Sequence, residues 1–186
     1  MKNNFAAAIY QSERTVFTLK EISVLLEEGN FNNLKSVVNY YVKKNIIRNV
    51  RRGIYTKEKY EPYELAVKLY PPAYISFETV LFNAGLIFQY DRTITAASYL
   101  SREVRVDDRH IRYRKLKDSI LTSPEGLIFN ALYSIAEKER AFLDMLYLNR
   151  DFYVDYLEKL DKKKIFKLLS IYKNAELEKK VKEIFK

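Results

Sequence analysis

The side chains best suited to recognise another molecule lie in a short stretch near the N-terminus, and they are cations and amides. Residues 31–59 contain eight Lys or Arg and a single acidic residue, Glu58. Such a concentration of positive charge attracts a polyanion, for which nucleic acid is the leading candidate. The simpler alternative is a solvated surface with no ligand. The eight cations are Lys35, Lys43, Lys44, Arg48, Arg51, Arg52, Lys57 and Lys59.

A helix is predicted to present part of this set on one face. Apolar residues from Leu34 to Val42 recur with a period of 3.6 residues, so they form a stripe that packs inward. Asn can pair with adenine, and Lys can contact guanine or phosphate. The opposite face is therefore a candidate recognition surface, although a tyrosine on it could also be partial core. That face carries Asn32, Asn33, Lys35, Ser36, Asn39, Tyr40 and Lys43.

A basic hairpin is predicted directly after this helix. A strand over 46–50 leads into a tight turn at 51–53, and a second strand over 54–56 returns. Arginine at the tip of a hairpin can press on the DNA backbone or the minor groove. The candidate DNA-binding set is therefore completed by Arg48, Arg51 and Arg52.

Two further helices are predicted to support these elements. The first covers residues 4–11. The second starts after Thr18, which forms a capping box with Glu21, carries Ile22, Leu25 and Leu26 inward, and ends at Gly29.

Asn30 or Asn32 then opens the candidate recognition helix. This order of helices and hairpin is typical of a winged helix-turn-helix, and we expect that domain over residues 1–60. A helix about 10–12 Å across fits the major groove of DNA.

Residues 61–186 are expected to form a second domain of mixed type, so the predicted fold class is α+β. Helices are predicted at 62–69 and 76–83. Strands at 93–96, 103–106 and 110–114 are expected to make a small antiparallel sheet, with a turn at Asp107-Asp108 between the last two. Terminal helices follow, beginning with a helical region over 124–148 whose inward residues are Leu127, Leu132, Ile135, Ala141, Leu143 and Leu146.

A second basic cluster lies on the predicted strands, at Arg102, Arg105, Arg109, Arg112 and Arg114. It either extends the DNA surface, meets an acidic partner, or belongs to an ordinary mixed surface, since three acidic residues are interleaved with it.

The composition argues against an enzyme, a metal site and a cofactor. There is no cysteine, and His110 is the only histidine of 186 residues, so thiolate sites and a metal site built on several histidines are excluded. The four glycines are scattered, so no phosphate-binding glycine loop is present. No apolar segment approaches the ~18 residues that span a bilayer. We therefore expect a cytoplasmic protein with no catalytic residues, no cofactor and no membrane contact.

Three stretches resemble a known family. They are RRGIY at 51–55, PYELAVKLYPPAYISFETVLFNAGLI at 62–87, and AEKERAFLDMLYLN at 136–149. In this order and spacing they resemble the AbiEi antitoxins, the transcription-repressing half of type IV toxin–antitoxin and phage abortive-infection systems.

The resemblance implies a winged helix-turn-helix that binds inverted repeats in its own promoter, with Asn32 to Lys43 as recognition helix and Arg51-Arg52 as wing. It also implies a nucleotidyltransferase toxin as functional partner, with direct contact left open. From the inverted repeat we expect two copies of the chain, a homodimer, on the DNA. By position, the core of the second domain would contain Ile75, Phe77, Leu81, Ala141, Leu143 and Leu146.

The sequence therefore favours a DNA-binding repressor that acts as an antitoxin. Two other readings stay open: a stand-alone regulator of the same fold, and a winged helix that holds a protein partner. An enzyme acting on nucleic acid would need clustered carboxylates, which the sequence does not predict.

Overall fold

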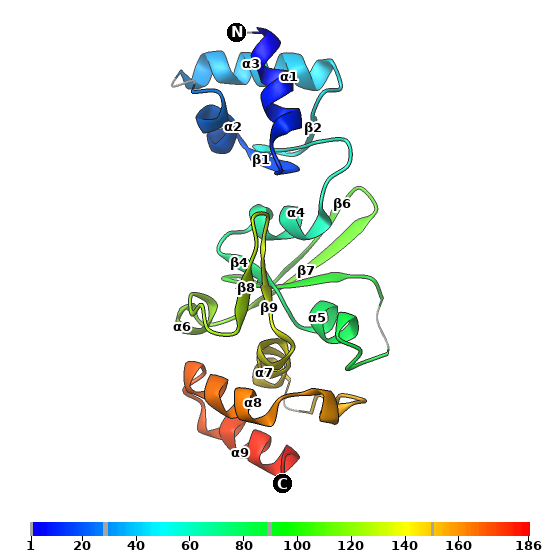
Figure 1. Cartoon of the computed structure of the whole chain (residues 1–186), viewed down its shortest axis with the longest axis vertical. Coiled ribbons are helices and arrows are strands. Elements are labelled where there is room, and N and C mark those ends of the chain that lie inside the picture. The colour runs from blue at the N-terminus through cyan, green and yellow to red at the C-terminus, as the bar shows by residue number, and fades with distance from the viewer. Residues whose placement is uncertain (1, 28–29, 89–90, 150) are drawn as a thin grey trace. The chain divides into compact units, whose positions relative to one another are not determined.

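The computed structural model describes residues 2–27, 30–88, 91–149 and 151–186. The fold is of the mixed α+β class, and the chain divides into two compact units, Met1–Leu69 and Tyr70–Lys186. We call them the first and second units. Figure 1 shows the elements of each.

The first unit places three helices before a hairpin and a fourth helix after it. Strands β1, β3 and β2 form an antiparallel sheet in that order, with Phe17 opposite Tyr55 and Arg48 opposite Thr56. The elements are α1 (Lys2–Gln11), β1 (Val16–Thr18), α2 (Leu19–Leu25), α3 (Phe31–Lys43), β2 (Arg48–Arg51), β3 (Ile54–Thr56) and α4 (Pro62–Leu69).

Local capping starts two of these helices. The Thr18 hydroxyl accepts a hydrogen bond from the Glu21 backbone N–H at 3.1 Å, and the Glu21 carboxylate accepts from Thr18 N–H at 2.8 Å. The predicted capping box is thus confirmed. Asn30 caps α3, because its Oδ1 accepts from the backbone N–H groups of Asn32 and Asn33.

The end of α2 differs from the expectation. The helix ends at Leu25, and Gly29 lies outside the described residues. Ile22 is buried as expected, but Leu25 is exposed, which corrects its predicted inward position. Leu26, four residues after Ile22, packs against the core instead, so the inward stripe of this short helix follows Ile22 and Leu26.

An apolar core holds the first unit together. The ring of Tyr41 on α3 stacks on Phe5 of α1, with 4.1 Å between ring centroids. This contact fixes the buried stripe of α3 against α1. The buried residues of the core are Phe5, Ile9, Phe17, Ile22, Leu34, Val38, Tyr41, Ile47 and Tyr55.

A buried carboxylate joins α4 to the first unit. Glu64 Oε2 accepts hydrogen bonds from the Thr15 N–H at 2.9 Å, the Thr15 hydroxyl at 2.7 Å and the Val16 N–H at 3.2 Å. Lys68 Nζ lies 3.0 Å from the other oxygen of Glu64 and 2.9 Å from Glu21 Oε1. These contacts extend the unit to Leu69, past the boundary expected after residue 60.

The second unit is built on a six-stranded sheet in the order β6-β7-β5-β4-β9-β8. Its strands are β4 (Ala73–Ile75), β5 (Ile94–Ser98), β6 (Arg102–Val106), β7 (Arg109–Lys115), β8 (Leu127–Phe129) and β9 (Ser134–Ala136). Its helical elements are α5 (Glu78–Asn83), α6 (Asp118–Leu121), α7 (Lys138–Leu148), η1 (Leu157–Lys159), α8 (Lys162–Leu168), η2 (Leu169–Ile171) and α9 (Ala175–Ile184).

This sheet is not the small antiparallel one expected from the sequence. β5 pairs in parallel with β7, and β4 pairs in parallel with β9. Strand β7 lies between β6 and β5. It forms an antiparallel hairpin with β6 and runs parallel to β5. The three strands read from the sequence and the Asp107-Asp108 turn are confirmed.

The expected helical region over 124–148 is wrong in its first half. Leu127 and Ile135 lie on the two strands of the β8–β9 hairpin, and the helix begins only at Lys138. Asn130 stabilises the reversal, because its Oδ1 accepts from the N–H groups of Leu132 and Tyr133. Leu127, Leu132 and Ile135 are accordingly only partly buried.

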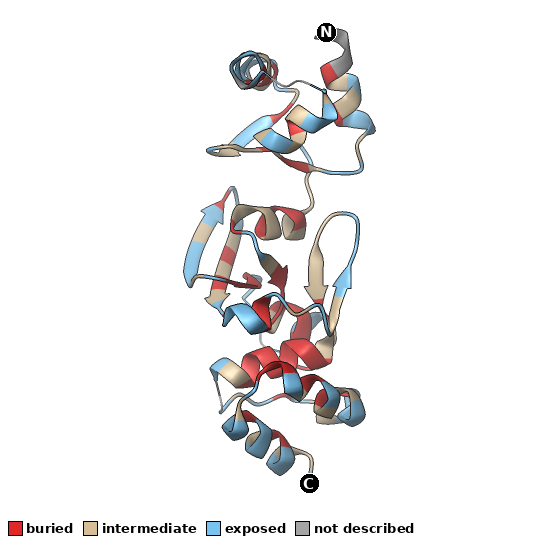
Figure 2. Ribbon diagram, turned by 90° about the vertical axis from the view of Figure 1, so that its left-hand side faces the viewer, coloured by how far each residue is buried: buried red, intermediate tan, exposed pale blue. Residues whose placement is uncertain are grey.

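The core of the second unit lies around α7, which is buried along most of its length (Figure 2). The six residues expected there by family resemblance are all buried, which confirms their position. They are Ile75, Phe77, Leu81, Ala141, Leu143 and Leu146.

A charged pair is buried within this core. Arg140 Nε lies 3.3 Å from Asp144 Oδ1, and neither side chain is exposed. Asp144 also accepts hydrogen bonds from the hydroxyls of Tyr172 at 2.7 Å, Ser76 at 2.8 Å and Tyr74 at 2.9 Å. The guanidinium of Arg140 donates to the carbonyls of Ile120 and Glu125.

The surroundings of this pair set its ionisation. Burial, and then the negative charge of Asp144, raise the pKa of Tyr74 and Tyr172, so both phenols stay protonated as donors. Burial disfavours the charge of Arg140, but Asp144, Tyr172 and Tyr74 together outweigh burial and raise the pKa of the guanidinium. We call these four residues, together with Ser76, the Arg140 network.

Candidate nucleic-acid interface

The structure brings the predicted recognition residues of α3 to one exposed face. Leu34 and Val38 are fully buried on the opposite side of the helix. The amphipathic pattern in the sequence therefore gives the correct orientation of α3. The exposed side chains are Asn32, Asn33, Lys35, Ser36, Asn39, Tyr40 and Lys43.

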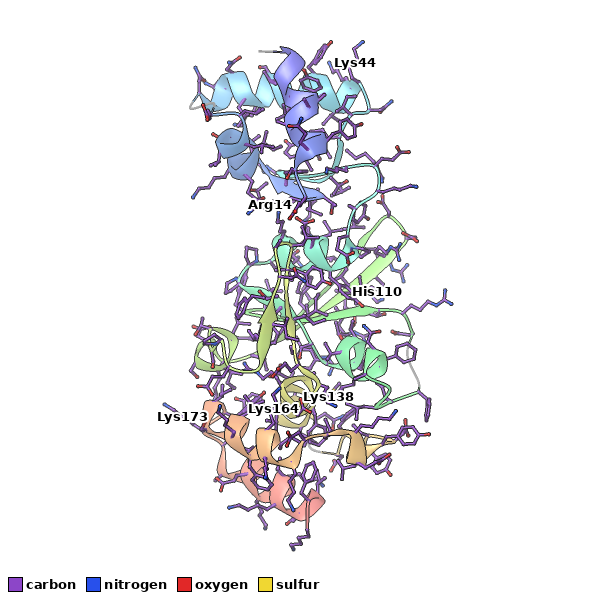
Figure 3. All side chains as sticks on the ribbon, in the orientation of Figure 1. Arg14, Lys44, His110, Lys138, Lys164 and Lys173 are labelled. Atoms are coloured by element: carbon purple, nitrogen blue, oxygen red, sulfur yellow. The ribbon has the colours of Figure 1, made fainter. Side chains whose placement is uncertain are left out.

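Two contacts order side chains on this face. The Ser36 hydroxyl donates to the Asn32 carbonyl at 3.2 Å. Tyr40 is 43% exposed, so it belongs to the surface and not to the core. The Lys44 ammonium lies 5.9 Å from the centroid of the Tyr40 ring, and the side chain of Lys44 points outward at the end of α3 (Figure 3). The predicted DNA-binding set does not include Lys44. Its place directly after the last residue of α3 could have indicated that it lies beside the same face.

The hairpin β2–β3 carries the remaining predicted residues. Arg51 lies opposite Ile54, and the register shifts between Asn49 and Arg51, so the strand bulges at that point. Arg52 and Gly53 form the turn, in which Gly53 has a φ of +79°, a conformation that favours glycine. Arg48 and Arg52 are exposed and Arg51 is half-buried. The geometry therefore places three guanidiniums on one short hairpin next to α3 in the chain.

Lys57 has a structural role instead of contributing to this surface. Its Nζ donates to the Ser12 carbonyl at 2.6 Å and lies 3.4 Å from the Tyr10 carbonyl. Its backbone N–H also bonds the Thr15 carbonyl. Lys57 therefore connects the end of β3 to the end of α1, and its ammonium group is hydrogen-bonded to backbone carbonyl oxygens.

The second basic cluster is largely paired with acidic groups. Arg112 Nε bonds Glu103 at 2.6 Å, and Arg114 is paired with Glu78. Arg109 lies 3.3 Å from Asp108. The hydrogen bond from Arg112 lowers the pKa of Glu103 below its usual value. These contacts favour the mixed-surface reading over a second DNA surface.

His110 lies on β7 (Figure 3) in a polar ladder of the same sheet. Its Nε2 is 3.0 Å from Glu103 and its Nδ1 is 3.1 Å from the Thr93 hydroxyl. These two contacts give His110 a structural role in the sheet.

Within the described part of the chain, no three or more His, Asp or Glu side chains gather in a way that could hold a metal ion. Over the same residues, every helix is too short or too polar to cross a bilayer.

The sequence did not lead us to expect two of the buried charged groups, Glu64 and the Arg140 network. The signal for each was a charged residue in an apolar helical stripe with an opposite charge four positions later: Glu64 with Lys68, and Arg140 with Asp144.

Comparison with known proteins adds no family assignment, because neither a protein-family model nor a curated protein matches this chain.

Proposed function

We propose that this protein is a DNA-binding transcriptional repressor, the antitoxin of a type IV toxin–antitoxin system of the AbiEi kind. The observation that carries the proposal is the composition of one surface: nine of the ten predicted residues on α3 and the hairpin are exposed, and Arg51 is half-buried. Lys and Arg on that surface suit phosphate, and its amides suit base edges.

The order of elements supports a winged helix. α1, β1, α2 and α3 are followed by the β2–β3 hairpin, and the three strands form one antiparallel sheet. In this arrangement α3 takes the major groove and the hairpin tip reaches the adjoining backbone.

Repression would be steric. Two copies on an inverted repeat, with half-sites one or more helical turns of ~34 Å apart, would cover the promoter. Phosphate contacts from Lys35, Lys43 and the hairpin arginines supply affinity, while Asn32 and Asn39 supply sequence preference. The functional partner is a nucleotidyltransferase toxin.

The test is binding to a labelled duplex of the protein's own upstream region, with scrambled DNA as control, at several salt concentrations. Lys35→Ala is expected to reduce the salt slope by about 0.9. Asn39→Ala is expected to cost about 1–3 kcal/mol on the specific duplex and little on the scrambled one.

Lys179→Ala is the matched control, since it removes the same charge from an exposed site on α9. Equal weak binding of the native protein to both duplexes, with Lys35→Ala and Lys179→Ala indistinguishable, would contradict the proposal. The surface would then fit a protein partner better.

A further inference from the structure

The two edges of the six-stranded sheet differ in chemistry. The β6 edge carries exposed Arg102, Glu103 and Arg105, and charged side chains of this kind discourage another strand from pairing. The β8 edge is Leu127-Ile128-Phe129, in which Ile128 is 53% and Phe129 62% exposed. All eleven residues from 126 to 136 are uncharged.

The backbone of β8 is open on the side away from β9. Glu137 N–H bonds the Gly126 carbonyl at 2.8 Å, and Asn130 N–H bonds the Tyr133 carbonyl at 3.2 Å. Bonded pairs in an antiparallel ladder recur at every second residue, so Ile128 is also paired inward. Phe129 therefore turns its N–H and carbonyl outward, and among the described strands β9 is the only neighbour of β8.

We propose that β8 pairs with β8 of a second copy of this chain, antiparallel about a two-fold axis at Ile128. The Phe129 N–H of each copy would donate to the Leu127 carbonyl of the other. Leu127 N–H is already bonded to the Pro124 carbonyl, so the pairing adds two backbone hydrogen bonds.

Charge restricts where a second copy can dock. The chain carries a net charge of +9, so two copies repel each other unless they meet through a neutral surface. The β8–β9 hairpin is such a surface because it carries no charged residue, and the exposed Ile128 and Phe129 of β8 are apolar and can pack against their own copies.

Area sets the strength of this contact. The exposed parts of Ile128 and Phe129 amount to roughly 200 Å² per copy, since an aromatic side chain buries about 150–250 Å² at most. A stable interface needs about 800 Å² per partner, so the free protein is expected to be mainly monomeric. Two copies held on neighbouring DNA half-sites have a high effective concentration, which favours the pair. This last step rests on the proposed function.

The first test uses the absence of native cysteine. In the proposed register the two Ile128 Cα atoms lie about 4.5 Å apart, which is within disulfide reach. Under mild oxidation at high protein concentration, Ile128→Cys is expected to form a linked dimer about tenfold faster than Tyr153→Cys, and faster still on two-site DNA. Tyr153 is 78% exposed and so reports random collision. Equal rates for the two variants, with and without DNA, would overturn the proposal.

The second test compares one-site and two-site duplexes. Phe129→Lys is expected to bind one half-site as the native protein does, while the Hill coefficient on two half-sites falls from near 2 towards 1. Tyr153→Lys should leave both unchanged. Native cooperativity in Phe129→Lys would overturn the pairing.

The two tests separate the two proposals. If no variant binds DNA specifically, the proposed repressor fails, and the linking rate of Ile128→Cys in free solution still decides the β8 contact. If Ile128→Cys does not link but Phe129→Lys abolishes toxin neutralisation, a different protein occupies this edge and the second copy is excluded.

Discussion

On α3 of the first unit Lys35 and Lys43 extend into solvent, whereas on α7 of the second unit Arg140 is completely buried beside Asp144. The exposed lysines keep their hydration and remain able to meet an anion. Arg140 and Asp144 have exchanged water for protein groups, and each of them has several hydrogen-bond partners. The same type of charge is thus accessible to an anion in one unit and part of the packing in the other.

Distance alone does not distinguish the two situations. The exposed Arg112–Glu103 pair is closer, at 2.6 Å, than the buried Arg140–Asp144 pair at 3.3 Å. An exposed pair contributes little, because water and salt screen it. Breaking a buried pair leaves an uncompensated charge in the core, so burial decides which pair matters for stability.

The largest expected effect is therefore at Asp144. Asp144→Ala should lower the free energy of unfolding by about 3–5 kcal/mol, because it leaves Arg140 unpaired and three hydroxyls without their acceptor. Urea unfolding followed by circular dichroism measures the loss, and hydrogen exchange of α7 peptides assigns it to the second unit. Glu103→Gln is the control. If it destabilises the protein as much as Asp144→Ala does, burial does not decide which ion pair matters for stability.

A smaller effect is expected on DNA binding from the hairpin. Arg51→Ala/Arg52→Ala should weaken binding to all duplexes and reduce the salt slope by roughly 1–2, while unfolding stays close to native. Titrations of labelled DNA at four salt concentrations give the slope. The double variant Lys163→Ala/Lys179→Ala removes the same charge from exposed positions of α8 and α9. An unchanged slope in the arginine variant would remove the hairpin from the interface.

The smallest effect is expected at Glu21, whose side chain is half-buried. Burial raises its pKa, but hydrogen bonds from Thr18 and Lys68 outweigh burial and lower the pKa below 4.5. The unfolded state then binds more protons, so the contribution is present above pH 4.5 and is lost as the pH falls through the folded pKa. Glu21→Gln should cost about 1 kcal/mol or less at pH 7 and flatten this acid dependence.

Denaturation of both proteins between pH 7 and pH 3 checks the sign. A native protein whose stability rises on acidification through this window would contradict the assignment. Glu13→Gln is a suitable control, because Glu13 is exposed near the same elements.

Local patterns in the sequence predicted the elements of the first unit well. The capping box at Thr18 and Glu21 and the apolar stripe of α3 depend on neighbours only a few residues apart, so spacing alone reveals them. The same holds for α4, whose predicted bounds at 62–69 match the structure.

Features that depend on distant neighbours were not predictable in this way. Leu127 and Ile135 fit a helical stripe as well as a hairpin, and the choice is made by pairing of β9 with β4. The position of β7 between β6 and β5 has no local signature either. Glu64 belongs to the first unit because of hydrogen bonds to Thr15 and Val16, nearly fifty residues earlier.

Within the candidate site, the exposed face of α3 was predictable, but the separate role of Lys57 was not. Its partners are carbonyls at the end of α1, and a count of charges along the chain treats it like any other cation.

The contact between Lys57 and the end of α1 also has a consequence for genetics. In a selection for loss of the proposed repression, Lys57 substitutions are expected together with those at Arg51 and Arg52, and they would suggest a missing DNA contact. Their cause would be different, because a hairpin released from Ser12 and Tyr10 no longer holds its arginines in place. Second-site suppressors would tell the two apart: added cations elsewhere on the surface would rescue the arginine variants but not Lys57→Ala.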